Sequence, residues 1–259
     1  MSYNLKELLL FFSIFLILSC EKHQDIYFKD FAVVSAKIEA SKAGYEILKM
    51  GGNAFDAMIA TDLALAVVYP NAGNLGGGGF MVYRSADGDY GSLDYREKAP
   101  LASTKDMYLD EDNNVVKGLS SEGALSIGVP GTVAGLFETY QRFGSLPLDS
   151  LFKPAMKLAK YGFPLTKKQA KSFNQNKRKI LSNSNNIDLF KKDFVEGMVF
   201  NNPALYSTLK FILENGKDGF YGGKISDEII EFTASKGCLL YTSDAADEGL
   251  GVDLGGRRI

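Results

Sequence analysis

The sequence predicts a fold that mixes α-helices with β-strands, in the broad α/β class that includes α+β folds. Three observations carry this prediction. Apolar residues recur at helical spacing in residues 36–50 and 54–68, two strand-like runs follow at 80–84 and 90–95, and amphipathic helical patterns return from residue 132 onward. The composition, with 46% hydrophobic and 23% charged residues in a chain of 259, is that of a globular protein.

Residues 1–19 are predicted to be an export signal. The almost unbroken apolar run at residues 8–18 is shorter than the about 20 residues that span a bilayer, and it fits the core of a secretory signal. The run ends in a sequence that resembles a bacterial lipobox, so Cys20 is expected to carry lipid and residues 20–30 to form a tether. A plain export signal without lipid is the alternative.

The residue counts exclude several kinds of site. A net charge of −2 and a pI near 5.6 leave no basic surface that would indicate a nucleic-acid partner. The one histidine, His23, falls in the expected tether, and with Cys20 lipidated only Cys238 remains. A disulfide framework, a histidine-based triad and a zinc site are therefore not expected, and no metal is predicted.

The first two helices are predicted from apolar spacing and end signals. In residues 36–50 the apolar side chains share one face, and a Gly-Gly pair ends the pattern. Asn53 is expected to cap the next helix, residues 54–68, with Asp56 in its first turn, where the helix dipole favours negative charge. That second helix is apolar nearly all round, so we expect it to be buried.

Four consecutive glycines precede the first strand: Gly76, Gly77, Gly78 and Gly79. A phosphate-binding loop is excluded, because no Lys-Ser or Lys-Thr follows and residues 80–84 form a strand pattern where a helix would be needed. A tight turn explains the run, and the alternative is the close approach of another backbone or of a ligand. An Asp-Gly pair then predicts a hairpin that joins this strand to residues 90–95.

The sequence LDYREKAP, at the end of the second strand, contains the best candidate in the chain for binding a carboxylate. Arg96 stands there with Asp94 and Glu97 beside it. An arginine guanidinium presents a fork of donors that matches two carboxylate oxygens, and it does not lose its proton. An ordinary ion-paired surface arginine is the alternative.

Four further helices are predicted downstream, at residues 132–143, 147–162, 203–215 and 224–235. The polar span at residues 172–188 is predicted to be a surface excursion, with helix only in its first half. The lysines around it are predicted to form a solvated face. A glycine-rich turn is expected at residues 216–223.

Several ordered motifs give the chain a resemblance to a known family. It is similar to the large-subunit portion of a bacterial gamma-glutamyltransferase, also called glutathione hydrolase. The resemblance lies in the runs EILKMGGNAFDAMIATDLALAVVYPNAGNLGGGGFMVY, LDYREKAP, GVPGTVAGL and PAMKLAKYGFPLT, which follow in the expected order. It covers about residues 31–237.

The resemblance implies the fold and chemistry of an N-terminal-nucleophile hydrolase. Such proteins form a four-layer αββα sandwich, with two stacked sheets between layers of helices. They are made as one precursor that cuts itself into a large and a small subunit. A threonine at the new N-terminus of the small subunit attacks the gamma-glutamyl amide of a donor such as glutathione, with its own amine as base, and the glutamyl group passes to water, an amino acid or a peptide. No cofactor is implied.

The resemblance also assigns expected roles to residues of this chain. Arg96 is expected to pair with the donor's alpha-carboxylate, with Asp94 and Glu97 as its motif neighbours. The four glycines are expected to be structural, allowing backbones to approach, and not to bind a ligand. Thr104, in a loop, and Thr132, at a helix start, are expected to be turn or capping residues. Because family members are much longer than this chain, the resemblance implies that the catalytic threonine lies beyond residue 259.

The chain as given is therefore expected to be inactive alone, with an incomplete sandwich. Residues 238–259 do not resemble the family and look like a translated cloning or sequencing scar, with a divergent natural tail as the alternative. Three functions stay open. The first is a truncated gamma-glutamyltransferase precursor, exported and lipid-anchored; the second is a related amidase such as a cephalosporin acylase; the third is a non-catalytic lipoprotein that keeps the scaffold for binding.

Overall fold

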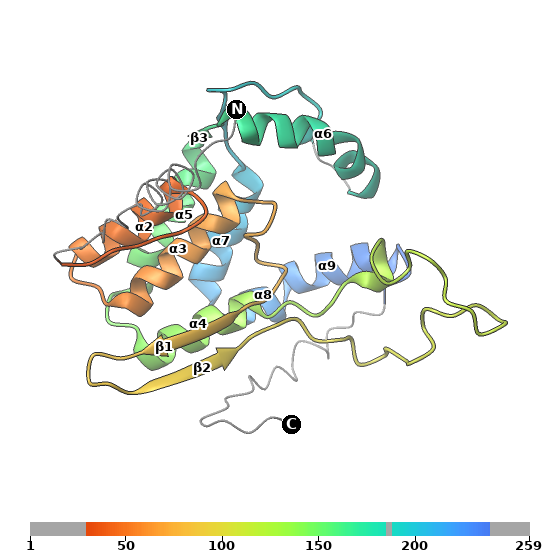
Figure 1. Cartoon of the computed structure of the whole chain (residues 1–259), viewed down its shortest axis with the longest axis horizontal. Helices are drawn as coiled ribbons and strands as arrows, with labels where there is room; N and C mark the ends of the chain where they lie inside the picture. The colour runs from red at the N-terminus through yellow and green to blue at the C-terminus, as the bar shows by residue number, and fades with distance from the viewer. Residues whose placement is uncertain (1–29, 185–187, 239–259) are drawn as a thin grey trace, which may run out of the picture. The chain divides into compact units, whose positions relative to one another are not determined.

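The computed structural model describes residues 30–184 and 188–238, and the chain divides into two compact units, Met1–Ala32 and Val33–Ile259. The fold described here is that of the second unit (Figure 1). Its elements are α2 Ile38–Lys49, α3 Ala54–Val68, β1 Phe80–Arg84, β2 Tyr90–Asp94, α4 Thr132–Phe143, α5 Leu148–Tyr161, β3 Phe163–Pro164, α6 Lys167–Asn183, β4 Val199–Phe200, α7 Pro203–Asn215, α8 Asp218–Tyr221 and α9 Lys224–Ala234, with single 3₁₀ turns at Ala124–Ser126 and Asp188–Phe190.

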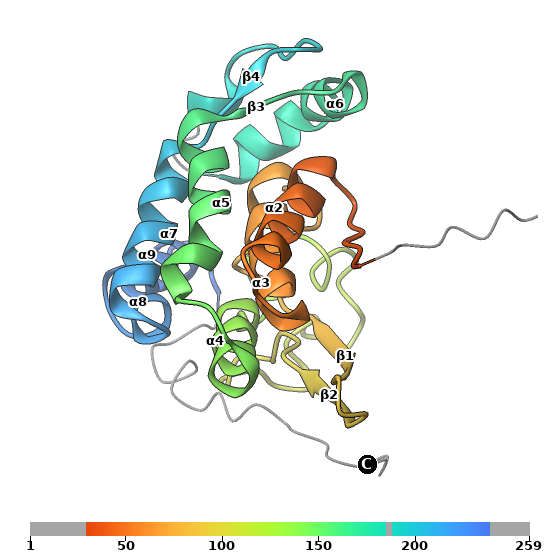
Figure 2. The ribbon, with the colours of Figure 1, turned by 90° about the vertical axis from the view of Figure 1, so that its left-hand side faces the viewer.

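Helix α3 lies at the centre of the helical core. It contacts α2, α5 and α4, and α5 in turn contacts α7 (Figure 2). Ile59, Leu63 and Val68 of α3 are fully buried, as are Leu151 of α5 and Leu209 of α7. The burial that the all-round apolar pattern predicts for this helix is therefore confirmed, and the bounds of α3 agree with the prediction.

The start of α3 is fixed by a reciprocal capping box. The Asn53 side chain accepts hydrogen bonds from the backbone N–H groups of Phe55, at 2.8 Å, and Asp56, at 2.9 Å. The fully buried Asp56 carboxylate accepts from the backbone N–H of Asn53 and of Ser145, both at 3.0 Å, and from the Ser145 hydroxyl. The cap thus satisfies helix donors and also holds the turn that follows α4.

Strands β1 and β2 form a two-stranded antiparallel ribbon, and the predicted hairpin is confirmed. Met81 lies opposite Leu93 in the register, and both side chains point to the inner face. With Tyr95 they form a buried cluster that packs against Phe55 at the start of α3 and Phe143 at the end of α4. The inner face is therefore covered by helices.

The outer face of the ribbon is not covered in the described part of the chain. Phe80 is 63% exposed, Val82 87% and Tyr90 85%. Alternation along each strand explains why these apolar side chains share one face. A two-stranded ribbon with one open face is marginal on its own, so the helices beneath it supply its support.

The polar segment after residue 166 forms a longer helix than its composition predicts. Helix α6 covers Lys167–Asn183 and begins with a second capping box, in which Gln169 N–H donates to Thr166 Oγ1 at 3.2 Å and Thr166 N–H to Gln169 Oε1 at 3.0 Å. Gln169 Nε2 also donates to the Val68 carbonyl at 3.0 Å, which ties α6 to the end of α3. A helix in the first half of residues 172–188 is expected and is present, but α6 continues past that half to Asn183.

A cluster of aromatic side chains anchors α6. Phe173 contacts Phe190, Phe194 and Phe200 with ring centroids 5.1–5.5 Å apart, and Phe200 belongs to β4, which pairs with β3. In both ribbon views α6, β3 and β4 lie at the end of the unit opposite the β1–β2 ribbon (Figures 1 and 2). The lysines at the start of α6 are exposed, as predicted.

The glycine-rich segment at 216–223 contains a short helix, α8, where the sequence predicts only a turn. Tyr221 in this helix donates its hydroxyl to the Pro130 carbonyl at 2.9 Å and accepts from the Ala134 N–H at 3.0 Å. Helix α8 therefore contributes to holding the start of α4.

Candidate functional site

Arg96 lies just after β2, at the end of the ribbon that meets the glycine run. Its side chain is exposed, and its Cζ lies 6.0 Å from the centroid of the Phe80 ring. Its backbone N–H donates to Asp94 Oδ1 at 2.9 Å. Among residues 30–184 and 188–238, no carboxylate lies within ion-pair distance of its guanidinium. The fork of donors is therefore open to an added anion.

Asp94 and Glu97 take different positions beside this arginine. The Asp94 side chain closes a local turn by accepting the Arg96 N–H, so its charge is directed at the backbone. Glu97 is exposed, and its backbone nitrogen lies close to Gly78 and its Cβ close to Gly128. The structure thus brings all three motif residues to one short segment, which is anchored through its main chain.

The glycine run supports this segment by direct backbone contact. Gly79 and Tyr95 exchange two backbone hydrogen bonds, at 3.0 and 3.2 Å, which continue the ribbon past the ends of β1 and β2. A Cβ added at Gly78 would lie 2.6 Å from the Glu97 nitrogen and 2.7 Å from Arg96 Cα. No side chain fits at Gly78 unless the arginine segment moves.

The other two glycines of the run differ from each other. The Gly77 carbonyl accepts the backbone N–H groups of Gly131, at 2.7 Å, and Thr132, at 2.9 Å, so it caps the start of α4. Gly76 has no described atom within 4 Å of the place a Cβ would take. Thr132 is the first residue of α4, and Thr104 lies in the loop after the arginine motif.

Tyr95 connects the arginine segment to the helices below it. Its side chain is only 7% exposed, and its ring lies against the backbone of Gly79 and Gly135. Burial, together with the charge of Asp62 on α3, raises the pKa of the Tyr95 phenol to about 12. Burial likewise raises the pKa of the Asp62 carboxyl to about 6.

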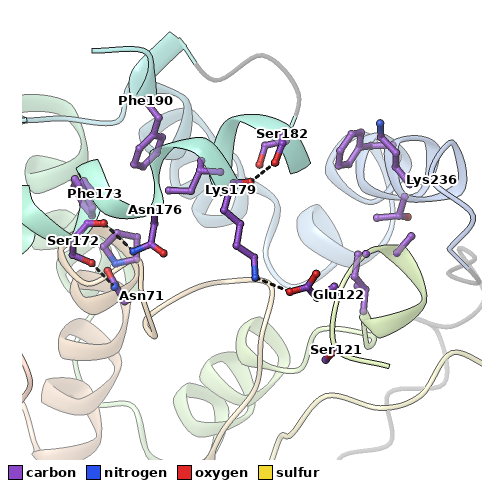
Figure 3. Close-up of a pocket in the computed structure, with 18 residues that line it drawn as sticks. Asn71, Ser121, Glu122, Ser172, Phe173, Asn176, Lys179, Ser182, Phe190 and Lys236 are labelled. Atoms are coloured by element: carbon purple, nitrogen blue, oxygen red, sulfur yellow. Dashed lines mark hydrogen bonds and ion pairs between the residues drawn. The ribbon is translucent and has the colours of Figure 1, made fainter. Parts of the chain in front are cut away.

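A cavity of about 910 Å³ lies away from this site, between α6, α9 and the loop that contains the first 3₁₀ turn (Figure 3). Lys179 of α6 reaches across it to Glu122 at 3.1 Å, and Asn71 donates to Ser172 at 3.2 Å at its other end. Phe173 and Phe190 form part of its apolar wall. No residue of the arginine segment lines it.

The described ranges contain neither a metal-binding cluster nor a membrane-spanning helix. No group of three His, Cys, Asp or Glu side chains there is placed to hold a metal ion. None of the helices in those ranges is both long and apolar enough to cross a bilayer. Cys238 is a buried free thiol, whereas Cys20 and His23 lie outside the described residues.

Four residues near the site were not singled out from the sequence. Phe80 lies under the Arg96 guanidinium, Gly131 and Gly135 give Tyr95 room, and Asp62 acts on its phenol. The spacing of Gly131 and Gly135, four residues apart at the start of a predicted helix, puts both on one face and could have indicated a close contact. No sequence signal links Phe80 or Asp62 to the arginine.

The comparisons with known proteins agree in one family. The family model described as gamma-glutamyltranspeptidase matches residues 40–247. The glutathione hydrolase proenzyme of Pseudomonas sp. (strain A14) is 43% identical over 220 residues, which are 82% of this chain and 38% of that protein. The proenzyme of Escherichia coli K12 is 39% identical over 218 residues, 83% of this chain and 38% of its own length.

Solved structures give the same result for the fold. The gamma-glutamyltranspeptidase of Helicobacter pylori superimposes with a TM-score of 0.84 at 39% identity, over 88% of this chain and 66% of that one. The cephalosporin acylase of Bacillus halodurans gives a TM-score of 0.72 at 25% identity, over 90% of this chain and 46% of that one. The fold is therefore that of the N-terminal-nucleophile hydrolases, and this chain has part of it.

The chain spans little more than a third of the length of these curated relatives, 38% in both of the proenzymes above. The family model nevertheless matches most of the chain, and the matched residues include the ribbon, the glycine run and the arginine segment. The chain belongs to the gamma-glutamyltranspeptidase family.

Proposed function

We propose that this chain is the large-subunit part of a self-processing gamma-glutamyltransferase that cleaves gamma-glutamyl amides such as glutathione. The observation that carries the proposal is Arg96, an exposed guanidinium without a carboxylate partner among the described residues, on a segment fixed by backbone contacts. A donor's alpha-carboxylate would pair with this fork in a bidentate manner. The membership of the family and the proenzyme names of its relatives support the same function.

The proposed reaction proceeds in two acyl transfers. A threonine of the small subunit, which we expect beyond residue 259, attacks the gamma-carbonyl carbon of the donor, and its own amine takes the hydroxyl proton. The amide C–N bond of the donor then breaks. The amine that leaves the donor takes that proton, and the glutamyl group remains on the threonine as an ester. Water, an amino acid or a peptide then attacks the ester and releases the threonine. Arg96 holds the donor and takes no part in these proton transfers.

This proposal makes the small subunit of the same precursor the required partner of the present chain. The nucleophile and its base would both come from that subunit, so the chain alone is expected to bind donors weakly and to release no product. We further propose that no cofactor takes part, since the threonine and its amine supply both the nucleophile and the base.

The experiment that tests the function starts from the gene. Genomic DNA is read beyond the codon for Gly237, and the complete precursor is produced and examined on a denaturing gel beside an assay of gamma-glutamyl-p-nitroanilide cleavage. Two bands with release of the anilide are expected. Two bands without release would favour the related amidase, and a single uncut band without release would favour the non-catalytic scaffold.

The same genomic read tests the proposed end of the family region. We propose that residues 238–259 are a cloning or sequencing scar that replaces the natural continuation. The family match ends at residue 247, inside that segment, so the read decides where the family sequence stops. A genomic sequence identical to residues 238–259 would contradict the proposal.

The role of Arg96 is tested by Arg96→Lys in the complete enzyme. Lysine keeps the charge but loses the fork, so one charged hydrogen bond to the donor is lost. The KM for the donor should therefore rise by about tenfold or more. Arg84→Lys is the matched control, because Arg84 is also exposed and lies at the far end of the same ribbon. An unchanged donor KM in Arg96→Lys would show that Arg96 does not bind the carboxylate of the donor.

We also propose that the protein is exported to the bacterial cell envelope and anchored through lipid on Cys20. The support is the sequence of residues 8–20, an apolar run that ends in a lipobox-like motif. Cells that produce the protein are labelled with radioactive palmitate, and the Cys20→Ala variant is compared. Label on the parent chain alone is expected, whereas equal labelling of both would contradict the anchor.

A further inference from the structure

Asp94 and Phe80 contact Arg96 in different ways. The register of the ribbon places Phe80 opposite Asp94, two residues before the arginine. Asp94 holds the Arg96 backbone through a 2.9 Å hydrogen bond, and the Phe80 ring lies beneath the guanidinium, with its centroid 6.0 Å from Cζ. One neighbour therefore fixes the main chain and the other faces the charged group.

Within the described residues, the Phe80 side chain takes no part in the buried cluster of the ribbon. The buried cluster of the ribbon is made of Met81, Leu93 and Tyr95 on the inner face, whereas Phe80 points outward and is 63% exposed. Phe80 is less exposed than Val82 and Tyr90 on the same face, at 63% against 87% and 85%. Within the described residues, Arg96 is the charged group over this ring.

An aromatic face under a guanidinium has two physical effects. The electron-rich face attracts the cation, and the contact restricts the rotamers of a long side chain. A free arginine loses much of its conformational entropy when an anion immobilises it, so an arginine held beforehand binds the anion more tightly. The ring covers one face of the planar group and leaves its edge donors available.

We propose that Phe80 is a positioning residue that holds the Arg96 guanidinium ready for the alpha-carboxylate of the donor, while Asp94 fixes the Arg96 backbone. This inference rests on the proposed function of Arg96. It adds a specificity-determining role for an exposed aromatic residue that the arginine motif itself does not contain. Phe80 acts through Arg96 and does not take part in the chemical step.

The test uses the complete precursor with gamma-glutamyl-p-nitroanilide as donor. Phe80→Leu should raise the donor KM about two- to fivefold, which corresponds to the loss of an exposed cation–π contact. The kcat should not change, because the contact supports donor binding equally in the ground state and the transition state. Phe80→Tyr keeps the ring and should restore the parent KM. Val82→Leu is the matched control, because Val82 lies on the same face of β1 two residues from Phe80 and so shares any covering of that face in the complete precursor.

The outcomes separate this inference from the proposed function. If Arg96→Lys raises the donor KM and Phe80→Leu does not, the role of Phe80 is wrong and that of Arg96 stands. If neither variant changes the KM, both fail. A loss of kcat in Phe80→Leu with a lowered unfolding temperature would show a merely structural role and would also overturn the inference.

A second measurement needs no catalysis and uses the chain as it is. In nitrogen-15 NMR spectra the side-chain Nε–Hε signal of Arg96, assigned through Arg96→Lys, should carry an upfield ring-current shift from Phe80. The shift should disappear in Phe80→Leu and remain in Val82→Leu. A signal at the position of an ordinary solvated arginine in the parent chain would contradict the contact.

Discussion

The helical part of the chain and the β1–β2 ribbon differ in how completely they are covered. In the helices, Ile59, Leu151 and Leu209 are almost fully buried, whereas Val82 and Tyr90 on the ribbon are 87% and 85% exposed. The helices thus bury these side chains within the described residues, whereas the ribbon has one open face. Because the fold of the family stacks two sheets, we expect the rest of that fold to cover the open face beside the arginine.

The sharpest test of the helical part is Asp56→Ala. This change leaves the N–H groups of Asn53 and Ser145 without their buried acceptor, which should cost about 3 kcal/mol of unfolding free energy. Urea denaturation measures the loss. The control is Asp149→Ala, which removes an exposed aspartate from the first turn of α5 and should change stability far less. Equal losses would show that the buried cap is not what holds α3.

A smaller effect is expected where the ribbon continues into the arginine segment. Gly78→Ala puts a Cβ 2.6 Å from the Glu97 nitrogen, and such overpacking costs about 1–3 kcal/mol. Gly76→Ala, two residues earlier, meets open space and should change the free energy of unfolding by only a few tenths of a kcal/mol. Thermal unfolding compares the two. Equal stability of the two variants would mean that the backbone at Arg96 and Glu97 moves to accommodate the added Cβ at little cost in free energy.

Asp62 lies where the helical part meets the ribbon, and it predicts a pH dependence. Its pKa is about 6 in the folded chain and 3.8 in the reference state, so folding favours the protonated form. Unfolding therefore releases a proton between these values, and stability should fall as the pH rises from about 4 to about 6. Above that window the loss is complete, at about 1–2 kcal/mol for a carboxyl that is not fully enclosed.

The variant Asp62→Asn should remove this dependence. It should be more stable than the parent above pH 6 and nearly equal to it below pH 4. Chemical denaturation at a series of pH values gives the comparison, with Glu231→Gln, a change of an exposed carboxylate on α9, as control. A parent and variant that differ by the same amount at every pH would contradict the assignment to Asp62.

The smallest effect is expected on the open face of the ribbon. Val82→Thr should change the stability of the present chain by no more than about 0.5 kcal/mol, because the side chain is already in water. In the complete precursor the same change should cost more, since a second sheet would bury that face. Equal small effects in both proteins would show that the outer face stays open and would break the comparison between the two regions.

Most of the helices and strands could be predicted because each has a strong local pattern. The bounds of α3, α4 and α7 agree with residues 54–68, 132–143 and 203–215. The polar sequence of α6 indicates only part of this helix, because the buried ring of Phe173 and the cap at Thr166 hold it in place. Such anchors act through tertiary contacts, which periodicity does not record.

The site could be predicted in part for a similar reason. The chemistry of guanidinium and its place at a strand end pointed to Arg96, and the glycines indicated a close approach of backbones. Which backbones meet, at Gly78 and Glu97, depends on how the chain returns after β2. Phe80 carries no charge or motif, and only the ribbon register brings its ring under the arginine.

The Gly77 carbonyl that accepts the N–H groups of Gly131 and Thr132 has a consequence for local motion. The first turn of α4 and the glycine run share these bonds, so neither can open without breaking them. Exchange of the Gly131 and Thr132 amide hydrogens with solvent therefore reports on the backbone that supports Arg96, 35 residues away in the sequence from Gly131. An anion held by Arg96 would slow that exchange from a distance, because it stabilises the closed arrangement.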